Sequence, residues 1–91
     1  MELKQWRLEF KPGWDTHFKG FDKSTQQRIM NKFDQMKSPL QGRGLHGSRF
    51  KVEEVGGYRI AFIGDEPMQA RKIHFVGSHK QYERWYSGRS E

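Results

Sequence analysis

The 91-residue chain contains no cysteine and only three prolines, and hydrophobic residues make up only 33% of it. Without cysteine it can form neither a disulfide framework nor a thiolate metal site. No apolar run approaches the roughly 20 residues that a membrane-spanning helix needs, and the charged opening is unlike a signal peptide. Because a chain of this length has room for one small core, we expect a single cytoplasmic domain over residues 1–91 with no membrane contact.

Aromatic residues and positive charge are, in contrast, abundant. Phe, Trp and Tyr account for 14% of the chain, which argues against disorder, because disordered chains lack the large apolar side chains that offset ordering entropy. The formal net charge is +6, and both halves of the chain contribute to it. A folded body with this charge predicts an anionic partner, such as nucleic acid, the ribosome, anionic lipid or an acidic protein.

The N-terminal part predicts a strand followed by two helices. Apolar and polar residues alternate along Leu3–Phe10, which is typical of a half-buried strand. Aromatic residues then recur at helical spacing over Trp14–Phe21. In the next helix, Ser24 is the expected N-cap and Gln27 the third helical residue of a capping box. Together these two helices predict a helical hairpin from Trp14 to Lys37.

The C-terminal part predicts an antiparallel meander and a last helix. The three expected strands are Arg49–Val55, Tyr58–Gly64 and Gln69–Val76. In the third strand, Ile73 and Phe75 should face the core, and Gly77 should end the strand. Ser78 can then cap a short helix that runs to Tyr86. The fold class is therefore α+β: an N-terminal strand, a helical hairpin, an antiparallel three-strand meander and a short C-terminal helix.

The first hairpin of the meander has two possible registers. A two-residue turn would place Lys51 and Glu53 on the apolar face with Ile60. A three-residue loop over Val55–Gly57, with its second glycine in the left-handed conformation, instead places Lys51 beside Arg59 on the polar face. We favour the three-residue loop, because it separates the charged from the apolar side chains and a one-residue slip exchanges the two faces.

No standard catalytic motif is present, and the acidic residues are too scattered for a metal site. Lys51 and Arg59, together with His79 and Tyr82, are nevertheless suited to a phosphodiester: cationic groups bind phosphate, and His or Tyr transfers a proton. A structural role is the alternative for each of them. The two cations can pair with glutamates on a solvated sheet face, and the other two can serve as cap and packing aromatic.

Several motifs resemble those of a known family. Gly57–Phe62 and Ile73–His79 resemble the "GxYRhhY … hhxVGxH" signature of the RelE/ParE toxin superfamily, small basic proteins of bacterial and archaeal toxin–antitoxin modules. Leu45–Val52 is similar to the loop and strand that precede the arginine strand in that family. Gly77–Trp85 is similar to the "GTHxxYDx" ending of the HigB branch.

The resemblance implies a RelE-like fold and a ribosome-dependent mRNA endoribonuclease that inhibits translation. In that family the ribose 2'-hydroxyl attacks the adjacent phosphate without a metal or other cofactor. Arg59 would hold the scissile phosphate, Lys51 would bind phosphate or stand in as base, and His79 or Tyr82 would transfer protons. Further RNA or phosphate contacts would come from four basic residues: Arg43, Arg49, Lys80 and Arg84.

The sequence departs from the RelE branch at three positions. A second basic residue of that branch is replaced by Glu53, which is itself a possible base. His79 and Gln81 stand where the branch has arginines.

Other activities stay open at this point. The ParE branch inhibits DNA gyrase and is not a nuclease, so a non-nuclease binding toxin is an alternative, as is a degenerate member that binds only RNA or its antitoxin. A plain RNA-binding module is a third hypothesis. The expected partners are a cognate acidic antitoxin, partly disordered when free, and mRNA on the ribosome. The free protein is expected to be a monomer.

Overall fold

The computed structural model describes residues 6–37, 43–44, 50–65 and 67–87. Along the chain, the elements are β1 (Arg7–Phe10), a 3-10 turn η1 (Phe18–Gly20), α1 (Lys23–Gln35), β2 (Arg43–Gly44), β3 (Lys51–Val55), β4 (Tyr58–Asp65), β5 (Ala70–Ser78) and α2 (His79–Ser87). The predicted α+β class and the three-strand meander, here β3–β5, are confirmed.

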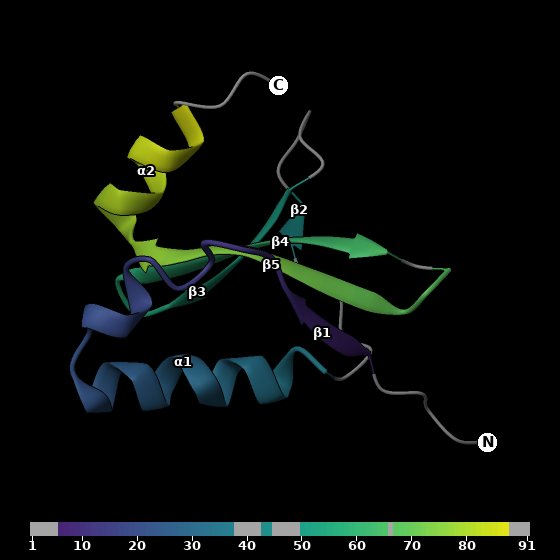
Figure 1. Cartoon of the computed structure of the whole chain (residues 1–91), viewed down its shortest axis with the longest axis horizontal. Coiled ribbons are helices and arrows are strands. Elements are labelled where there is room, and N and C mark those ends of the chain that lie inside the picture. The colour runs from purple at the N-terminus through teal and green to yellow at the C-terminus, as the bar shows by residue number, and fades with distance from the viewer. Residues whose placement is uncertain (1–5, 38–42, 45–49, 66, 88–91) are drawn as a thin grey trace.

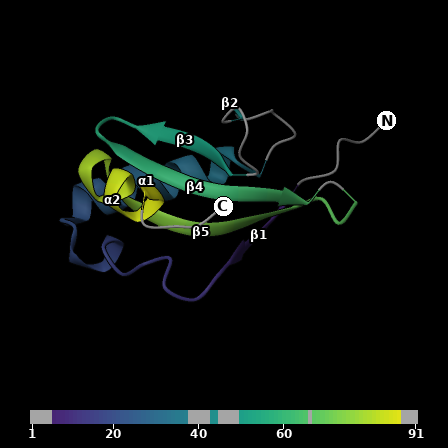
Figure 2. The ribbon, with the colours of Figure 1, turned by 90° about the horizontal axis from the view of Figure 1, so that it is seen from above.

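The strands form one sheet of five, in the order β1-β5-β4-β3-β2. β1 runs parallel to β5, and the other neighbours are antiparallel. Figure 1 shows α1 below the sheet and α2 rising from the end of β5, and Figure 2 shows the strand order from above. β2 adds a short edge strand where the sequence predicted only a loop.

Each face of the sheet carries its own hydrophobic cluster. The α1 face holds Ile29, Phe33, Met36, Ile60, Phe62, Ile73 and Val76. The α2 face holds Phe50, Ala61 and Phe75, with Ile63, Tyr82 and Trp85 packed against them. Both faces are covered in part, so the strands do not alternate simply between core and solvent.

The predicted three-residue loop between β3 and β4 is wrong. Val55 pairs with Tyr58, which leaves a two-residue turn whose first residue, Gly56, has a φ of +58°. Glu53 therefore lies on the α1 face, opposite Ile60. The charge is tolerated there because Lys32 of α1 approaches the Glu53 carboxylate to 3.7 Å. Lys32 thus compensates for the charge of Glu53 on the apolar face, and that charge was the reason to expect the other register.

A register shift between β4 and β5 explains a second difference. Ala61 pairs with Phe75 but Phe62 pairs with Ile73, so His74 is an extra residue on β5. The extra residue turns the two apolar side chains to opposite faces: Ile73 belongs to the α1 cluster and Phe75 to the α2 cluster. The prediction that both face one core is thus wrong, and β5 also continues through Gly77, which was expected to end it.

The first arm of the predicted helical hairpin is also absent as an α-helix. Over Trp14–Phe21 the chain forms turns and the three-residue η1, in which Gly20 and Phe21 donate to carbonyls three residues back and not four. α1 is the second arm. Its N-cap is Asp22 rather than the predicted Ser24, and the Asp22 carboxylate accepts a hydrogen bond of 3.1 Å from the Thr25 N–H.

We expect Asp22→Ala to lower the melting temperature and Asp22→Asn to lower it less, because asparagine keeps an acceptor for the cap. Hydrogen bonds from the hydroxyl and the N–H of Thr25 lower the pKa of Asp22. Because the pKa is lower in the folded than in the unfolded state, the ionised carboxylate stabilises the fold fully above the unfolded value of about 4, and this stabilisation is lost as the pH falls through the lower folded-state pKa. Thermal melts from pH 6 to pH 2 should therefore show the wild-type advantage over Asp22→Asn disappearing in acid. An advantage independent of pH would contradict this.

Gly77→Ala should destabilise the protein by about 1–3 kcal/mol, the usual cost of overpacking. A Cβ at this position would lie 2.6 Å from the ring of Phe75, which is buried and cannot swing away. Gly64→Ala is the matched control, because a Cβ on this β4 glycine meets nothing within 4 Å. Urea denaturation of the two variants should separate them, and equal stability would contradict the predicted clash.

Candidate functional site

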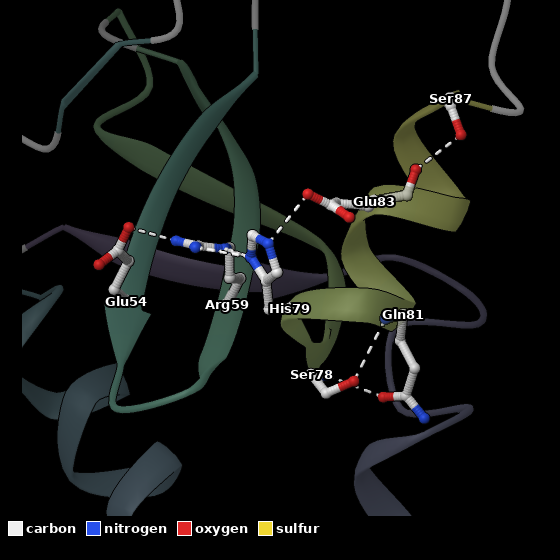
Figure 3. Close-up of polar contacts among 7 residues, drawn as sticks. All are labelled: Glu54, Arg59, Ser78, His79, Gln81, Glu83 and Ser87. Carbon is white, nitrogen blue, oxygen red and sulfur yellow. Dashed lines mark hydrogen bonds and ion pairs between the residues drawn. The ribbon is translucent and has the colours of Figure 1, made fainter.

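Arg59 is the centre of a polar array on the α2 face of the sheet (Figure 3). Its side chain is 22% exposed, and it lies opposite Glu54 on β3 and opposite Gly77 on β5. Nη1 of Arg59 donates to the Glu54 carboxylate. Gly77 has no side chain, and the space above it is taken by the ring of Phe75 and by Oε1 of Gln81, the second residue after His79 on α2.

The imidazole of His79 lies on the other side of the guanidinium. Nε of Arg59 donates to Nδ1 of His79 at 3.0 Å, and Nη2 lies 2.7 Å from the same atom. Nε2 of His79 is 2.9 Å from the Glu83 carboxylate. Arginine can only donate and a carboxylate can only accept, so these contacts assign the proton of the neutral ring to Nε2.

The backbone holds His79 at the first position of α2. Ser78 and Gln81 form a reciprocal capping box: the Gln81 N–H donates to Ser78 Oγ at 3.2 Å, and the Ser78 N–H donates to Gln81 Oε1 at 2.8 Å. The predicted cap is thus confirmed. The N–H of His79 donates to the carbonyl of Gly57 at 2.9 Å, which ties the start of the helix to the β3–β4 turn.

The site therefore presents a carboxylate, a guanidinium, an imidazole and a second carboxylate in a row. A guanidinium can bind phosphate, and a carboxylate and an imidazole on its two sides are groups that can accept and donate protons. In the free protein the positive charge of Arg59 is balanced by Glu54, so an incoming anion competes with that carboxylate for the guanidinium.

Lys51 does not join this array. It pairs with Phe62 and so lies on the α1 face, whereas Arg59 lies on the α2 face. The predicted Lys51 and Arg59 pair on one face is wrong because it depended on the rejected three-residue loop. Glu53, the possible base, shares the α1 face and is near Lys32.

Tyr82 lies one turn after His79 and packs into the α2 cluster, with its ring 6.4 Å from that of Phe75. Burial, more than the nearby Tyr86, raises the pKa of Tyr82, and Arg59 partly opposes the shift. A phenol with a raised pKa stays protonated at neutral pH, so it can donate a hydrogen bond but is a poor base.

The four other basic candidates are scattered. Lys80 and Arg84 are exposed on α2. The backbone of Arg43 pairs with Val52 as part of β2. Arg49 lies outside the described residues.

No group of three or more His, Cys, Asp or Glu residues that could hold a metal ion occurs within the described ranges. Nor does this part of the chain include a helix long and apolar enough to cross a membrane.

Neither Glu54 nor Glu83 was predicted as a residue of the site, although Glu54 was one of the glutamates that could pair with Arg59 across the strands. The signal for Glu83 was present, because it follows His79 by four residues and such pairs meet on a helix. Glu54 needed the correct register, since only a two-residue turn places it opposite Arg59.

No protein-family model and no curated protein sequence matches this chain. Solved structures do match. The isolated RelE toxin of E. coli is 15% identical with a TM-score of 0.68, and the match covers 80% of this chain and 83% of that one. The RelE–RelB complex from Pyrococcus horikoshii gives 12% identity, a TM-score of 0.64 and coverage of 80% and 93%.

The toxin–antitoxin complex RelBE2 of Mycobacterium tuberculosis is 12% identical with a TM-score of 0.68, covering 85% of this chain and 94% of that one. These identities are low, and the likeness is one of fold. The chain has a RelE-like toxin fold.

Proposed function

We propose that this chain is the toxin of a toxin–antitoxin pair and cleaves mRNA on the ribosome without a metal. The observation that carries the proposal is the Arg59 guanidinium held between the carboxylate of Glu54 and the imidazole of His79. The RelE-like fold and the names of its structural neighbours, which are toxins and toxin–antitoxin complexes, support the biological setting.

The proposed reaction is a transesterification. The ribose 2'-hydroxyl attacks the adjacent phosphorus while Glu54 accepts its proton, and the bond from phosphorus to the 5'-oxygen breaks as His79 protonates that oxygen. The products are a 2',3'-cyclic phosphate and a free 5'-hydroxyl. Arg59 binds the phosphate and stabilises the charge that develops on its oxygens.

Substrate binding prepares all three groups at once. When the phosphate takes the donors of Arg59, it frees Glu54 to act as the base. It also frees Nδ1 of His79, which then takes up a proton and makes the ring an imidazolium acid.

Arg59→Ala and Glu54→Gln should each reduce cleavage by at least about 100-fold, because each removes a group that acts in the transition state. Glu9→Gln is the matched control: it neutralises an exposed glutamate on β1 that pairs with Arg7 and is not part of the array. The measurement is 5'-end mapping of mRNA cleaved by the purified chain on programmed ribosomes, together with growth after induced expression. Circular dichroism confirms that each variant is folded.

Three results would contradict the proposal. They are full activity of Arg59→Ala, an equal loss in Glu9→Gln and Glu54→Gln, and intact messages during growth arrest by the wild type. Arrest with intact messages and broken DNA would indicate a gyrase inhibitor instead.

An apolar groove on the α1 face supports an antitoxin partner. It has a volume of about 450 Å³ and lies between β1 and α1, with Leu8, Phe10, Met30 and Phe33 among its lining residues. Phe10 and Met30 are 43% and 47% exposed, which is unusual for large apolar side chains. We propose that apolar side chains of an acidic antitoxin occupy this groove, since the chain itself is strongly basic.

Met30→Glu should weaken antitoxin binding at least about tenfold without impairing cleavage, because it places a charge in the groove and not in the site. Gln35→Glu adds the same charge to α1 on a residue that does not line the groove. The probe is the product of a short acidic reading frame next to this gene, with affinity measured by calorimetry. Unchanged affinity of Met30→Glu would rule out the groove as the binding site.

A further inference from the structure

We propose that Glu83 is a positioning residue that orients the His79 imidazole and fixes its tautomer. The consequence for catalysis rests on the proposed function, but the orientation of the ring does not. Glu83 lies on α2 four residues after His79, and its carboxylate accepts from Nε2 at 2.9 Å.

Two neighbours act on the ring from opposite sides and require the same tautomer. Arg59 can only donate, so it needs Nδ1 without a proton, whereas the Glu83 carboxylate can only accept, so it needs a proton on Nε2. The arrangement has the form of the carboxylate and imidazole pairs in which an acid residue holds a catalytic histidine in place.

Substrate binding would separate the roles of these two neighbours. Once the phosphate engages Arg59, that residue no longer holds Nδ1, and the contact with Glu83 stays. Glu83 then maintains the direction of the ring through the step in which His79 gains and loses a proton. Its negative charge also stabilises the imidazolium that forms, with Glu54 beyond Arg59 as the other nearby carboxylate.

The contact between Glu83 and His79 contributes little to the stability of the fold, because both side chains are more than half exposed, at 64% and 51%. Exposed ion pairs contribute little to folding. The helix backbone at Glu83 is secured separately, since Ser87 Oγ donates to the Glu83 carbonyl at 2.7 Å. Removing the Glu83 carboxylate should therefore disturb the ring and leave the fold intact.

The tautomer of His79 can be measured in the Arg59→Ala variant, which we expect to be inactive in cleavage. We suggest ¹⁵N NMR of the His79 ring in Arg59→Ala at alkaline pH, where imidazole rings are neutral, with His79→Gln used to assign the signals. Arg59→Ala should keep the proton on Nε2. Adding Glu83→Ala should lower that fraction to the value of an unconstrained imidazole, and adding Glu83→Gln should preserve it, because the amide oxygen still accepts.

Kinetics of the otherwise wild-type chain provide the second readout. Glu83→Ala should lower kcat about 10- to 100-fold with little change in KM, and Glu83→Gln should recover part of the loss. Glu9→Ala, which removes an exposed carboxylate on β1, should leave both constants unchanged. An Nε2–H fraction that Glu83→Ala leaves unchanged would overturn the inference. If the wild type does not cleave RNA, the proposed function fails, and the NMR comparison still decides the role of Glu83.

Discussion

The two-residue turn at Gly56 and Gly57 is the constraint on which the candidate site depends. It pairs Val55 with Tyr58 and therefore sets Glu54 opposite Arg59. A slip of one residue would send Glu54 to the α1 face and break the array, because side chains alternate along a strand. The carbonyl of Gly57 also accepts from the N–H of His79, so the same turn sets the position of the imidazole.

The rest of the site depends on how β5 ends. The extra residue at His74 turns Phe75 toward α2, where its ring stacks on Trp85 with centroids 4.8 Å apart. The absence of a side chain on Gly77 lets the ring of Phe75 pack over the backbone there, and Ser78 caps the helix that carries His79. The contacts that pack α2 on the sheet therefore also position the imidazole of His79.

The two proposed functional surfaces lie on opposite faces of the sheet. The array around Arg59 is on the α2 face, whereas the groove lined by Phe10 and Met30 is on the α1 face. An antitoxin segment bound in the groove would leave Arg59 uncovered. Silencing the site would then need a further segment of the partner that reaches the α2 face, as an extended chain that folds on binding can do.

The sequence by itself determined the α+β class, the meander, the Ser78 cap and the importance of Arg59 and His79 as candidates, because these follow from local periodicity, turn residues and side-chain chemistry. It did not determine the register of β3, the face of Phe75, or the partners of Arg59. Local pattern favoured separating charge from apolar residues, and only the tertiary structure, by bringing Lys32 of α1 to Glu53, made the other register acceptable. Which carboxylate meets Arg59 was therefore decided by contacts between elements far apart in the chain.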